Sequence, residues 1–469
     1  MHLVWLRRDL RVDDNPALSG ALASGEAVMA VYVATPVQWQ RHGLSHRQAD
    51  LIWRRLFELQ QDLAQLNVPL LYVEETDFRT AVARIASLCR AHDVTGVHAN
   101  REYELNEVER DQALQSALLE ANVDVTLYHD RCLMVPGSVI NKQGHYFKVF
   151  TPFKKALLSQ WQPAQIVKNK PASHIAVTKA DWPLLDRQTS SFSYPRQASD
   201  DWGVTTSAIR ARLREFCQHR VEDYHQERDF PSLDSTSRLS PYLAIGALSV
   251  RQCVARMAVN GQHQEQGGEV WLSELIWRDF YQHLVYFEPR LCQHQDFIAW
   301  GANVKWRESE QHLLAWQLGR TGYPIVDAAM RQLNQTGWMH NRLRMVVASF
   351  LTKDLHIDWR KGEHYFMTQL IDGDFASNNG GWQWCASTGC DGQPYFRIFN
   401  PTSQGERFDP GGDFVCHWIP ELKQVPTRYV HTPWLWSGFG GLDYPSPIVD
   451  HKAEREITLA AYKQAKDVE

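Results

Sequence analysis

The first 130 residues alternate between two kinds of pattern, and this alternation constrains the fold more than any other feature. Five short segments are apolar and rich in β-branched residues, which is typical of strands. They cover Leu3–Leu6, Val28–Val33, Leu70–Glu74, Val94–His98 and Val123–Leu127. Helical spacing lies between them, as in Gln48–Gln65 and Phe78–Ala91. Strands that alternate with helices predict βαβ units and a parallel sheet, so we expect a Rossmann-like α/β domain at residues 1–130.

The rest of the chain changes character twice. Residues 131–205 are rich in Pro, Ser and Asp without a sustained period, which predicts a long interdomain connection anchored by Trp182, Phe192 and Tyr194. Residues 206–469 are mostly helical, so the second domain is expected to be all-α. The expected helices include Val270–Phe287, Pro324–Leu333, Trp338–Leu351 and His451–Ala465. The glycine-rich stretch DGDFASNNGG is predicted to be a break between helices.

Several protein classes are disfavoured. No run of eighteen apolar residues exists, and basic residues follow the first apolar run instead of preceding it, so we expect an intracellular protein without a membrane span. The eight cysteines form no C-x-x-C pair, which predicts reduced thiols and no zinc site. Phosphate-loop, nucleophile-elbow and H-E-x-x-H motifs are absent, as is G-x-G-x-x-G after the first strand. Because the net charge is −5, a nucleic-acid surface would have to be local.

Three polar segments of the helical part could carry chemistry. In TSRLS, three hydroxyls and Arg238 precede a helix for which Ser240 is the candidate N-cap; this indicates either a plain cap or an anion site. Glu274, Trp277, Arg278 and Tyr281 share one helix face. That face suits either a solvated ion pair or a planar polar ligand.

The third segment is WMHNRLRM. Asn341, Arg344 and Met345 share a face, with Arg342 beside them, and buried unpaired arginines are costly. They therefore either reach solvent or meet anions, for which Asp372 and Asp374 are candidates. Twelve of the 18 tryptophans follow residue 205, which suggests a role beyond core filling.

Long stretches of the chain resemble the photolyase/cryptochrome family. The matching segments include HLVWLRRDLRVDDNPAL, TSRLSPYLAIGALS, WLSELIWRDFY, DWRKGEHYF and DGDFASNNGGWQWCASTG. The resemblance extends over essentially the whole chain and is strongest to the class I cyclobutane pyrimidine dimer photolyases of bacteria. It implies a helical domain that holds FAD. Asp372 is then expected to pair with Arg344, and Asn378 to face flavin N5. The implied FAD contacts are Tyr224, Thr236, Ser237, Arg238, Leu239, Ser240, Trp271, Glu274, Arg278, Trp338, Asn341, Arg344, Asp372, Gly373, Asp374 and Asn378.

The same resemblance assigns roles to tryptophans. Trp306, Trp359 and Trp382 match a chain that passes electrons between flavin and surface. Trp277 and Trp384 match an aromatic wall for a lesion turned out of the DNA, as in other enzymes that flip their target base. Glu274 and Asn341 match residues that hydrogen-bond the dimer, and Met345 packs on it. The positions that match DNA contacts are Arg228, Trp277, Arg342, Trp384 and Arg397.

The implied reaction is light-driven repair of cyclobutane pyrimidine dimers in UV-damaged DNA. Reduced anionic FAD gives an electron to the dimer, the two linking C–C bonds break, and the electron returns. Asn106 and Glu107 match a pair that binds an antenna chromophore, and Cys292 matches the opposite wall. This predicts 5,10-methenyltetrahydrofolate. Gln293 stands where close relatives carry a lysine that faces the folate tail, so a deazaflavin is the alternative.

The same residues disfavour three other functions. A cryptochrome photoreceptor typically has Asp or Cys where this chain has Asn378, and many carry a long C-terminal tail. A (6-4) photolyase has histidines at the positions of Asn341 and Met345. A flavin oxidoreductase needs a nicotinamide site, and none is evident. We therefore expect a monomeric repair enzyme, with the photoreceptor as the alternative.

Overall fold

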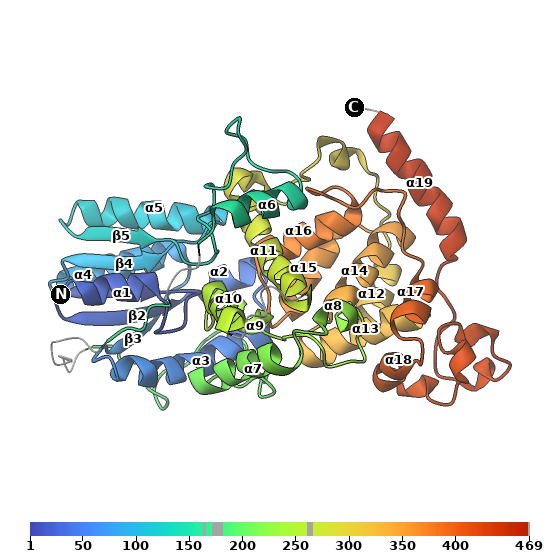
Figure 1. The fold of residues 1–469 in the computed structure, drawn as a ribbon, viewed down its shortest axis with the longest axis horizontal. Coiled ribbons are helices and arrows are strands. Elements are labelled where there is room, and N and C mark those ends of the chain that lie inside the picture. The colour runs from blue at the N-terminus through green and yellow to red at the C-terminus, as the bar shows by residue number, and fades with distance from the viewer. Residues whose placement is uncertain (163–165, 171–181, 260–265, 468–469) are drawn as a thin grey trace. The chain divides into compact units, whose positions relative to one another are not determined.

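The computed structural model describes residues 1–162, 166–170, 182–259 and 266–467. The segment 171–181 of the expected connection lies outside these residues. The chain forms two compact units, drawn in Figure 1. The sheet unit comprises Met1–Glu222, Ser237–Pro289 and Ile371–Asp374. The helical unit comprises Asp223–Thr236, Arg290–Leu370 and Phe375–Glu469.

The sheet unit is built on five parallel strands in the order β3-β2-β1-β4-β5, which confirms the predicted parallel sheet. Val4 of β1 is in register with Ala30 of β2 on one side and His98 of β4 on the other. The carboxyl ends of β1 and β4 therefore flank the switch point of the sheet, where open α/β sheets bind ligands. The strands are β1 (His2–Leu6), β2 (Val28–Ala34), β3 (Leu70–Glu74), β4 (Gly96–Asn100) and β5 (Asp124–Tyr128).

Helices pack around this sheet and continue into the rest of the unit (Figure 1). The N-termini are set by local side chains: Asn15 caps α1 ahead of Pro16, and Asp77 and Thr80 form a reciprocal capping box on α4. The helices of this unit are α1 (Pro16–Ala23), α2 (Pro36–Arg41), α3 (His46–Ala64), α4 (Phe78–Ala91), α5 (Leu105–Leu119), α6 (Phe150–Gln160), α7 (Thr206–His219), α9 (Ser240–Ala244), α10 (Val250–Val259) and α11 (Gln266–Phe287).

The segment expected to be an irregular interdomain connection contains α6, so that expectation was wrong for residues 150–160. Its later part is held as expected: Trp182, Phe192 and Tyr194 are buried in the sheet unit. Leu184 also forms an antiparallel bridge with Leu71 of β3, which places this part of the chain along the edge of the sheet.

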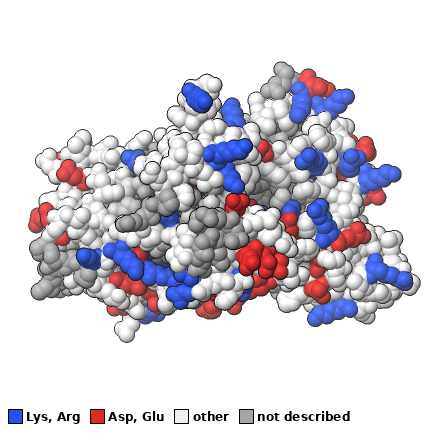
Figure 2. All heavy atoms as spheres, in the orientation of Figure 1, with Lys and Arg blue, Asp and Glu red and all other residues white. Residues whose placement is uncertain are grey.

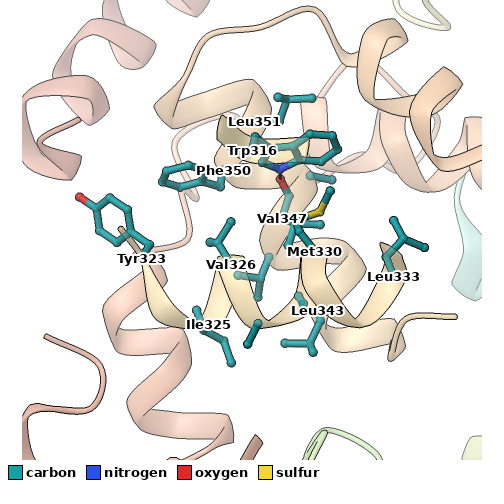
Figure 3. Close-up of a cluster of buried hydrophobic side chains, with 14 of the residues drawn as sticks. Trp316, Tyr323, Ile325, Val326, Met330, Leu333, Leu343, Val347, Phe350 and Leu351 are labelled. Atoms are coloured by element: carbon teal, nitrogen blue, oxygen red, sulfur yellow. Dashed lines mark hydrogen bonds between the residues drawn. The ribbon is translucent and has the colours of Figure 1, made fainter. Parts of the chain in front are cut away.

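The helical unit surrounds its own apolar core. Trp316 lies at the centre of this core, and its indole nitrogen donates to the carbonyl oxygen of Val347 at 3.0 Å (Figure 3). A single π-helical turn, Phe350–Asp354, extends α14. The helices are α8 (Tyr224–Glu227), α12 (Glu310–Leu318), α13 (Pro324–Thr336), α14 (Asn341–Ser349), α15 (Trp359–Gln369), α16 (Phe375–Ala386), α17 (Pro401–Phe408), α18 (Asp413–Trp418) and α19 (His451–Asp467).

The expected break between helices, residues 372–381, is only partly confirmed: Asp372, Gly373 and Asp374 lie between α15 (Trp359–Gln369) and α16 (Phe375–Ala386), whereas residues 375–381 are helical, contrary to expectation. The helix α16 begins at Phe375 and includes Gly380 and Gly381. It packs against α15 at Gly362, where an added Cβ would lie 2.1 Å from the Trp382 ring. Tertiary packing of the Trp382 ring against Gly362 therefore compensates for the low helix propensity of this sequence.

Candidate functional site

The helix α11 presents a polar and aromatic face in the sheet unit. Trp271 is buried, and the residues that follow on this face are half-buried: Glu274, Trp277 and Arg278. Trp277 stacks on Phe150 of α6, with ring centroids 3.7 Å apart and planes 6° from parallel. The protein thus covers one face of the Trp277 ring. Phe150 was not identified from the sequence because α6 was not expected.

The acidic segment between α15 and α16 belongs to the sheet unit and is held by distant side chains. Gln48 of α3 donates from its amide nitrogen to the carbonyl oxygen of Gly373 at 2.9 Å. Arg131 forms an ion pair with Asp374 at 2.5 Å. Asp372 and Asp374 are each 7% exposed, so both carboxyl groups are buried. The sequence analysis identified the two acids as candidate site residues. It identified neither Gln48 nor Arg131.

The predicted phosphate segment has an unusual backbone. Arg238 has a φ of 48°, in the left-handed region that residues other than glycine seldom adopt. Such conformations are concentrated at ligand sites. Ser240 was expected to cap the following helix, but Leu239 occupies the cap position and Ser240 is the first helical residue. Leu239 is buried, Ser240 is exposed, and Thr236 and Ser237 are half-buried.

In the helical unit, Asn378 is the central polar side chain of α16. It is 8% exposed, and its amide nitrogen donates to the carbonyl oxygen of Glu363 at 2.9 Å. Asn379 donates to the Glu363 carboxylate at 2.8 Å, so Glu363 holds both amides. Within the described residues, the Asn378 side chain makes no further hydrogen bond, which leaves its oxygen and second N–H for a ligand. Sequence reasoning missed Glu363.

The helix α14 carries the second polar face. Asn341 is exposed at its start, and Arg344 and Met345 are half-buried one turn later. Trp338, just before the helix, is 9% exposed. Arg344 and its predicted partner Asp372 belong to different units, so their pairing stays a prediction.

The predicted DNA-contact arginines all lie in the helical unit. Arg397 is exposed, and Arg228 lies over the buried ring of Tyr224, 5.3 Å from its centroid. Arg342 pairs with Asp229, from Nε to Oδ1 at 3.2 Å and from Nη2 to Oδ2 at 2.7 Å. The acids of the 371–374 segment had been the candidate partners, and Asp229 was not identified from the sequence.

The three tryptophans predicted to pass electrons lie in the helical unit. Trp382 is 2% exposed and Trp359 is 0% exposed, whereas Trp306 is half-buried. This order of burial suits a chain that ends near solvent. The Trp359 indole nitrogen donates to Asp296 at 2.9 Å, which fixes the ring. Trp384 is half-buried, unlike Trp382 two residues earlier.

The predicted antenna residues belong to two units: Asn106 and Glu107 to the sheet unit and Cys292 to the helical unit. The Asn106 amide and the Nε2 atom of His42 lie 2.9 Å apart, and Gln38 approaches the same atom at 2.8 Å. Burial lowers the pKa of His42 to about 4, so the ring is neutral and can accept. Burial and the neighbouring carboxylates raise the pKa of Glu107. The sequence did not identify His42.

Two features are absent from the part of the chain that the structure describes. The described residues contain no group of three or more His, Cys, Asp or Glu side chains that could hold a metal ion. Among the same residues, no helix is long and apolar enough to cross a membrane.

Comparison with known proteins places these features. The family model described as the FAD binding domain of DNA photolyase matches residues 271–464, and the model described as DNA photolyase matches residues 2–173. A curated relative from Vibrio cholerae, named deoxyribodipyrimidine photo-lyase, is 58% identical over 99% of this chain and 100% of its own. The match to the FAD-binding model and the two units of the fold together define the class of protein. It is a flavin-binding protein with a parallel α/β unit and a helical unit.

Comparison with solved structures leads to the same class of protein. A class III photolyase from Agrobacterium tumefaciens is 34% identical, covers 99% of this chain and 98% of its own, and has a TM-score of 0.87. A cryptochrome from Synechocystis is 29% identical, covers 98% of this chain and 99% of its own, and has a TM-score of 0.85. The chain belongs to the DNA photolyase family.

Proposed function

We propose that this protein repairs cyclobutane pyrimidine dimers in UV-damaged DNA by light-driven electron transfer. The observation that carries the proposal is the 58% identity, over the full length of both chains, to a protein named deoxyribodipyrimidine photo-lyase. The enzyme is then a carbon–carbon lyase, and FAD is its catalytic cofactor. UV-damaged DNA is its substrate.

The residues present fit FAD. Asn378 is a buried amide held by Glu363 and has hydrogen-bonding capacity to spare, as a ring nitrogen requires. A Cβ built on Gly381 meets no atom within 4 Å, so this turn of α16 borders open space. The strained backbone at Arg238 supplies a polar segment for phosphates. When bound and reduced, FAD supplies the light-driven electron.

The protein's side chains bind and orient the lesion. Trp277 is half-buried and backed by Phe150, which makes its ring a rigid platform for a base turned out of the duplex. Trp384 is the second wall. Glu274 and Asn341 hydrogen-bond the dimer, and Met345 packs on it. Stacking on aromatic rings excludes water from the C–C bonds that break.

Other residues bind the DNA backbone or supply electrons to the cofactor. Phosphates contact arginines of the helical unit: Arg228, Arg342 and Arg397. Trp382, Trp359 and Trp306 pass electrons inward from the surface, and the hydrogen bond from Trp359 to Asp296 keeps that ring in place. An indole suits the terminal position because, once oxidised, it can release its N–H proton to water at the half-buried Trp306.

The proposed antenna chromophore accounts for a further group of residues. Asn106, Glu107 and Cys292 bind 5,10-methenyltetrahydrofolate, with the neutral His42 fixing the Asn106 amide. A deazaflavin is the alternative occupant, because Gln293 cannot pair with a folate tail as a lysine would. The domains run over residues 1–130, 131–205 and 206–469 and act as antenna domain, connection and catalytic domain. The enzyme works as a monomer in the cytoplasm, where the nucleoid DNA lies.

A blue-light photoreceptor is the second candidate, because the cryptochrome of Synechocystis has the same fold. Repair is favoured by Asn378 and by the higher identity to the photo-lyase from Vibrio cholerae. The two functions differ in whether DNA is a substrate.

The test uses thymine tracts that carry UV-induced dimers. Protein with chemically reduced flavin should remove the dimers under blue light and leave them intact in darkness, as measured by chromatography of the digested DNA. Equal repair in the dark, or no repair in the light by protein that has bound reduced flavin, contradicts the proposal. A photoreceptor would absorb the light and leave the dimers unchanged.

A further inference from the structure

One acidic side chain lies among the arginines that the proposed function assigns to DNA. Asp229 follows α8 in the chain and belongs to the helical unit. It accepts two hydrogen bonds from Arg342, from Nε at 3.2 Å and from Nη2 at 2.7 Å. Its carboxylate also lies near Arg228, whose Nε is 3.9 Å from Oδ1. One carboxylate thus serves two arginines.

The contact uses the edge of the guanidinium that would hold a phosphate most strongly. Arginine binds carboxylates and phosphates through two parallel N–H bonds, and the Nε and Nη2 pair of Arg342 is already occupied in this way. The guanidinium also lies over the ring of Phe408, 4.5 Å from its centroid. Its Nη1 atom is 3.9 Å from the sulfur of Met345. Arg342 is therefore fixed in one orientation, with its counter-ion in place.

The ion pair does little for folding. The side chain of Asp229 is 32% exposed and that of Arg342 is 19% exposed, and solvated pairs of this kind contribute little to stability. Acidic and basic side chains are interspersed over the surface in Figure 2. Asp229, however, contacts arginines that are expected to bind phosphate. The charges of Arg228, Arg342 and Asp229 add up to +1 instead of +2.

We propose that Asp229 is a built-in competitor of DNA phosphates, which weakens the hold of Arg228 and Arg342 on the backbone. The inference rests on the proposed function, since it takes DNA as the ligand. Phosphate contacts supply most of the affinity for undamaged DNA. A phosphate that contacts these arginines must either displace the Asp229 carboxylate or lie close to its negative charge. Both lower the affinity by the same amount for damaged and undamaged duplexes. The enzyme then leaves undamaged stretches sooner, while recognition of the lesion by Trp277 and Trp384 is unchanged.

The test is the salt dependence of binding to a short undamaged duplex, measured by fluorescence anisotropy with the flavin-containing protein. Asp229→Asn keeps the shape of the side chain and removes its charge. The slope of log Kobs against log salt should steepen by about 0.9, the value of one more neutralised phosphate. Across a tenfold range of salt, this corresponds to roughly an eightfold larger change in affinity.

Two variants serve as controls. Asp443→Asn makes the same change of net charge at an exposed ion pair with Arg320, 3.4 Å apart, and should leave the slope unchanged. Asp229→Glu keeps the carboxylate and should behave as the wild type. Thermal melting of each variant verifies that it is folded. An unchanged or flatter slope for Asp229→Asn overturns the proposal, because it would mean that Asp229 orients Arg342 for DNA or is irrelevant to it.

A dimer-containing duplex completes the test. The ratio of affinities for damaged and undamaged DNA should be the same in Asp229→Asn and in wild type. A change confined to damaged DNA would place Asp229 at the lesion and would also overturn the proposal. Light-driven repair by the wild type reports separately on the proposed function, since the slope on undamaged duplex does not depend on catalysis.

Discussion

Trp382 and Trp384 differ sharply in surroundings although they lie two residues apart on α16. Two residues of an α-helix are about 200° apart around the axis, so the rings project to opposite sides. Trp382 faces the core, where it packs edge-on against Phe366, 5.0 Å between centroids. Trp384 is half-buried at the edge of that core. One short stretch can therefore supply both the proposed electron carrier and the proposed stacking ring, which is half-buried.

This difference predicts the effect of Trp384→Ala. Affinity for dimer-containing DNA should fall by about 1 to 3 kcal/mol, the value of one base–aromatic stack. Binding to undamaged duplex should barely change, because it depends on phosphate contacts. The measurement is competition between the two duplexes. A variant that melts far below wild type and still prefers damaged DNA as strongly would show that Trp384 only fills space.

Lys353 is a second residue with a specific environment. It is wholly buried, and its ammonium group donates to the Ser387 hydroxyl at 2.9 Å and to the Arg397 carbonyl oxygen at 3.4 Å. It thereby joins the start of the loop 387–400 to the exposed Arg397 further along the same loop. Burial lowers the pKa of Lys353 from 10.5 to about 8.

The pH dependence of stability should report this group. Between pH 8 and 10.5 the unfolded chain binds a proton at Lys353 that the folded chain does not, so this residue makes stability rise with pH in that window. In Lys353→Met that contribution is absent. The free energy of unfolding of the variant minus that of wild type should therefore be constant below pH 8 and fall toward pH 10.5. Urea denaturation at a series of pH values measures it, and a constant difference would contradict the assigned pKa.

At the scale of elements, the helices α15 and α16 can pack closely because Gly362 has no side chain. An added Cβ at Gly362 would lie 2.1 Å from the Trp382 ring and 2.6 Å from Leu351. Both neighbours are in the core and have little room to move. Glycine at this position therefore allows the two helices to pack closely.

Gly362→Ala should lower the free energy of unfolding by roughly 1 to 3 kcal/mol through overpacking. Better helix propensity offsets up to about 1 kcal/mol of this. The matched control is Gly381→Ala, also within a helix, where the new Cβ meets nothing within 4 Å. It should be neutral or stabilising in flavin-free protein. Equal effects of the two substitutions in urea denaturation would mean that packing at Gly362 is not limiting.

The elements differ in how well the sequence predicted them, for physical reasons. All five strands were expected, since buried parallel strands are continuous apolar runs. The helix α16 was missed because Asn378, Asn379, Gly380 and Gly381 have poor helix propensity, and packing outweighs it. The helix α6 is not evident from the sequence because its 11 residues lie within the long stretch 131–205, which has no sustained period.

The residues of the candidate site also differ in how well the sequence predicted them. Family motifs contain Asn378 and Trp277, so the sequence identified them. Their partners Glu363 and Phe150 contact them from other elements, and no local pattern marks such a pair. Asp229 is also far from Arg342 in the chain, so only the folded structure reveals that they pair.

At the scale of the whole molecule, the predicted flavin contacts come from stretches that are far apart in the chain, from Tyr224 to Asn378. A ligand that binds only the folded chain stabilises it by mass action. Adding FAD to flavin-free protein should raise the melting temperature progressively. The gain in stability should reach about 2.7 kcal/mol when free FAD is a hundredfold above its Kd. A melting temperature independent of FAD concentration would show that folding and flavin binding are uncoupled.

The late position of the 371–374 segment in the chain affects how the protein is made. Gln48 donates to the carbonyl oxygens of Ile371 and Gly373, and it precedes Ile371 by 323 residues. At about 5 to 20 residues per second, these acceptors leave the ribosome roughly 15 to 65 seconds after Gln48. Any folding of the sheet unit during that interval proceeds without the 371–374 segment. Asp372 and Asp374 are thus supplied late in synthesis, so the nascent chain acquires its two central carboxylates only after most of its length exists.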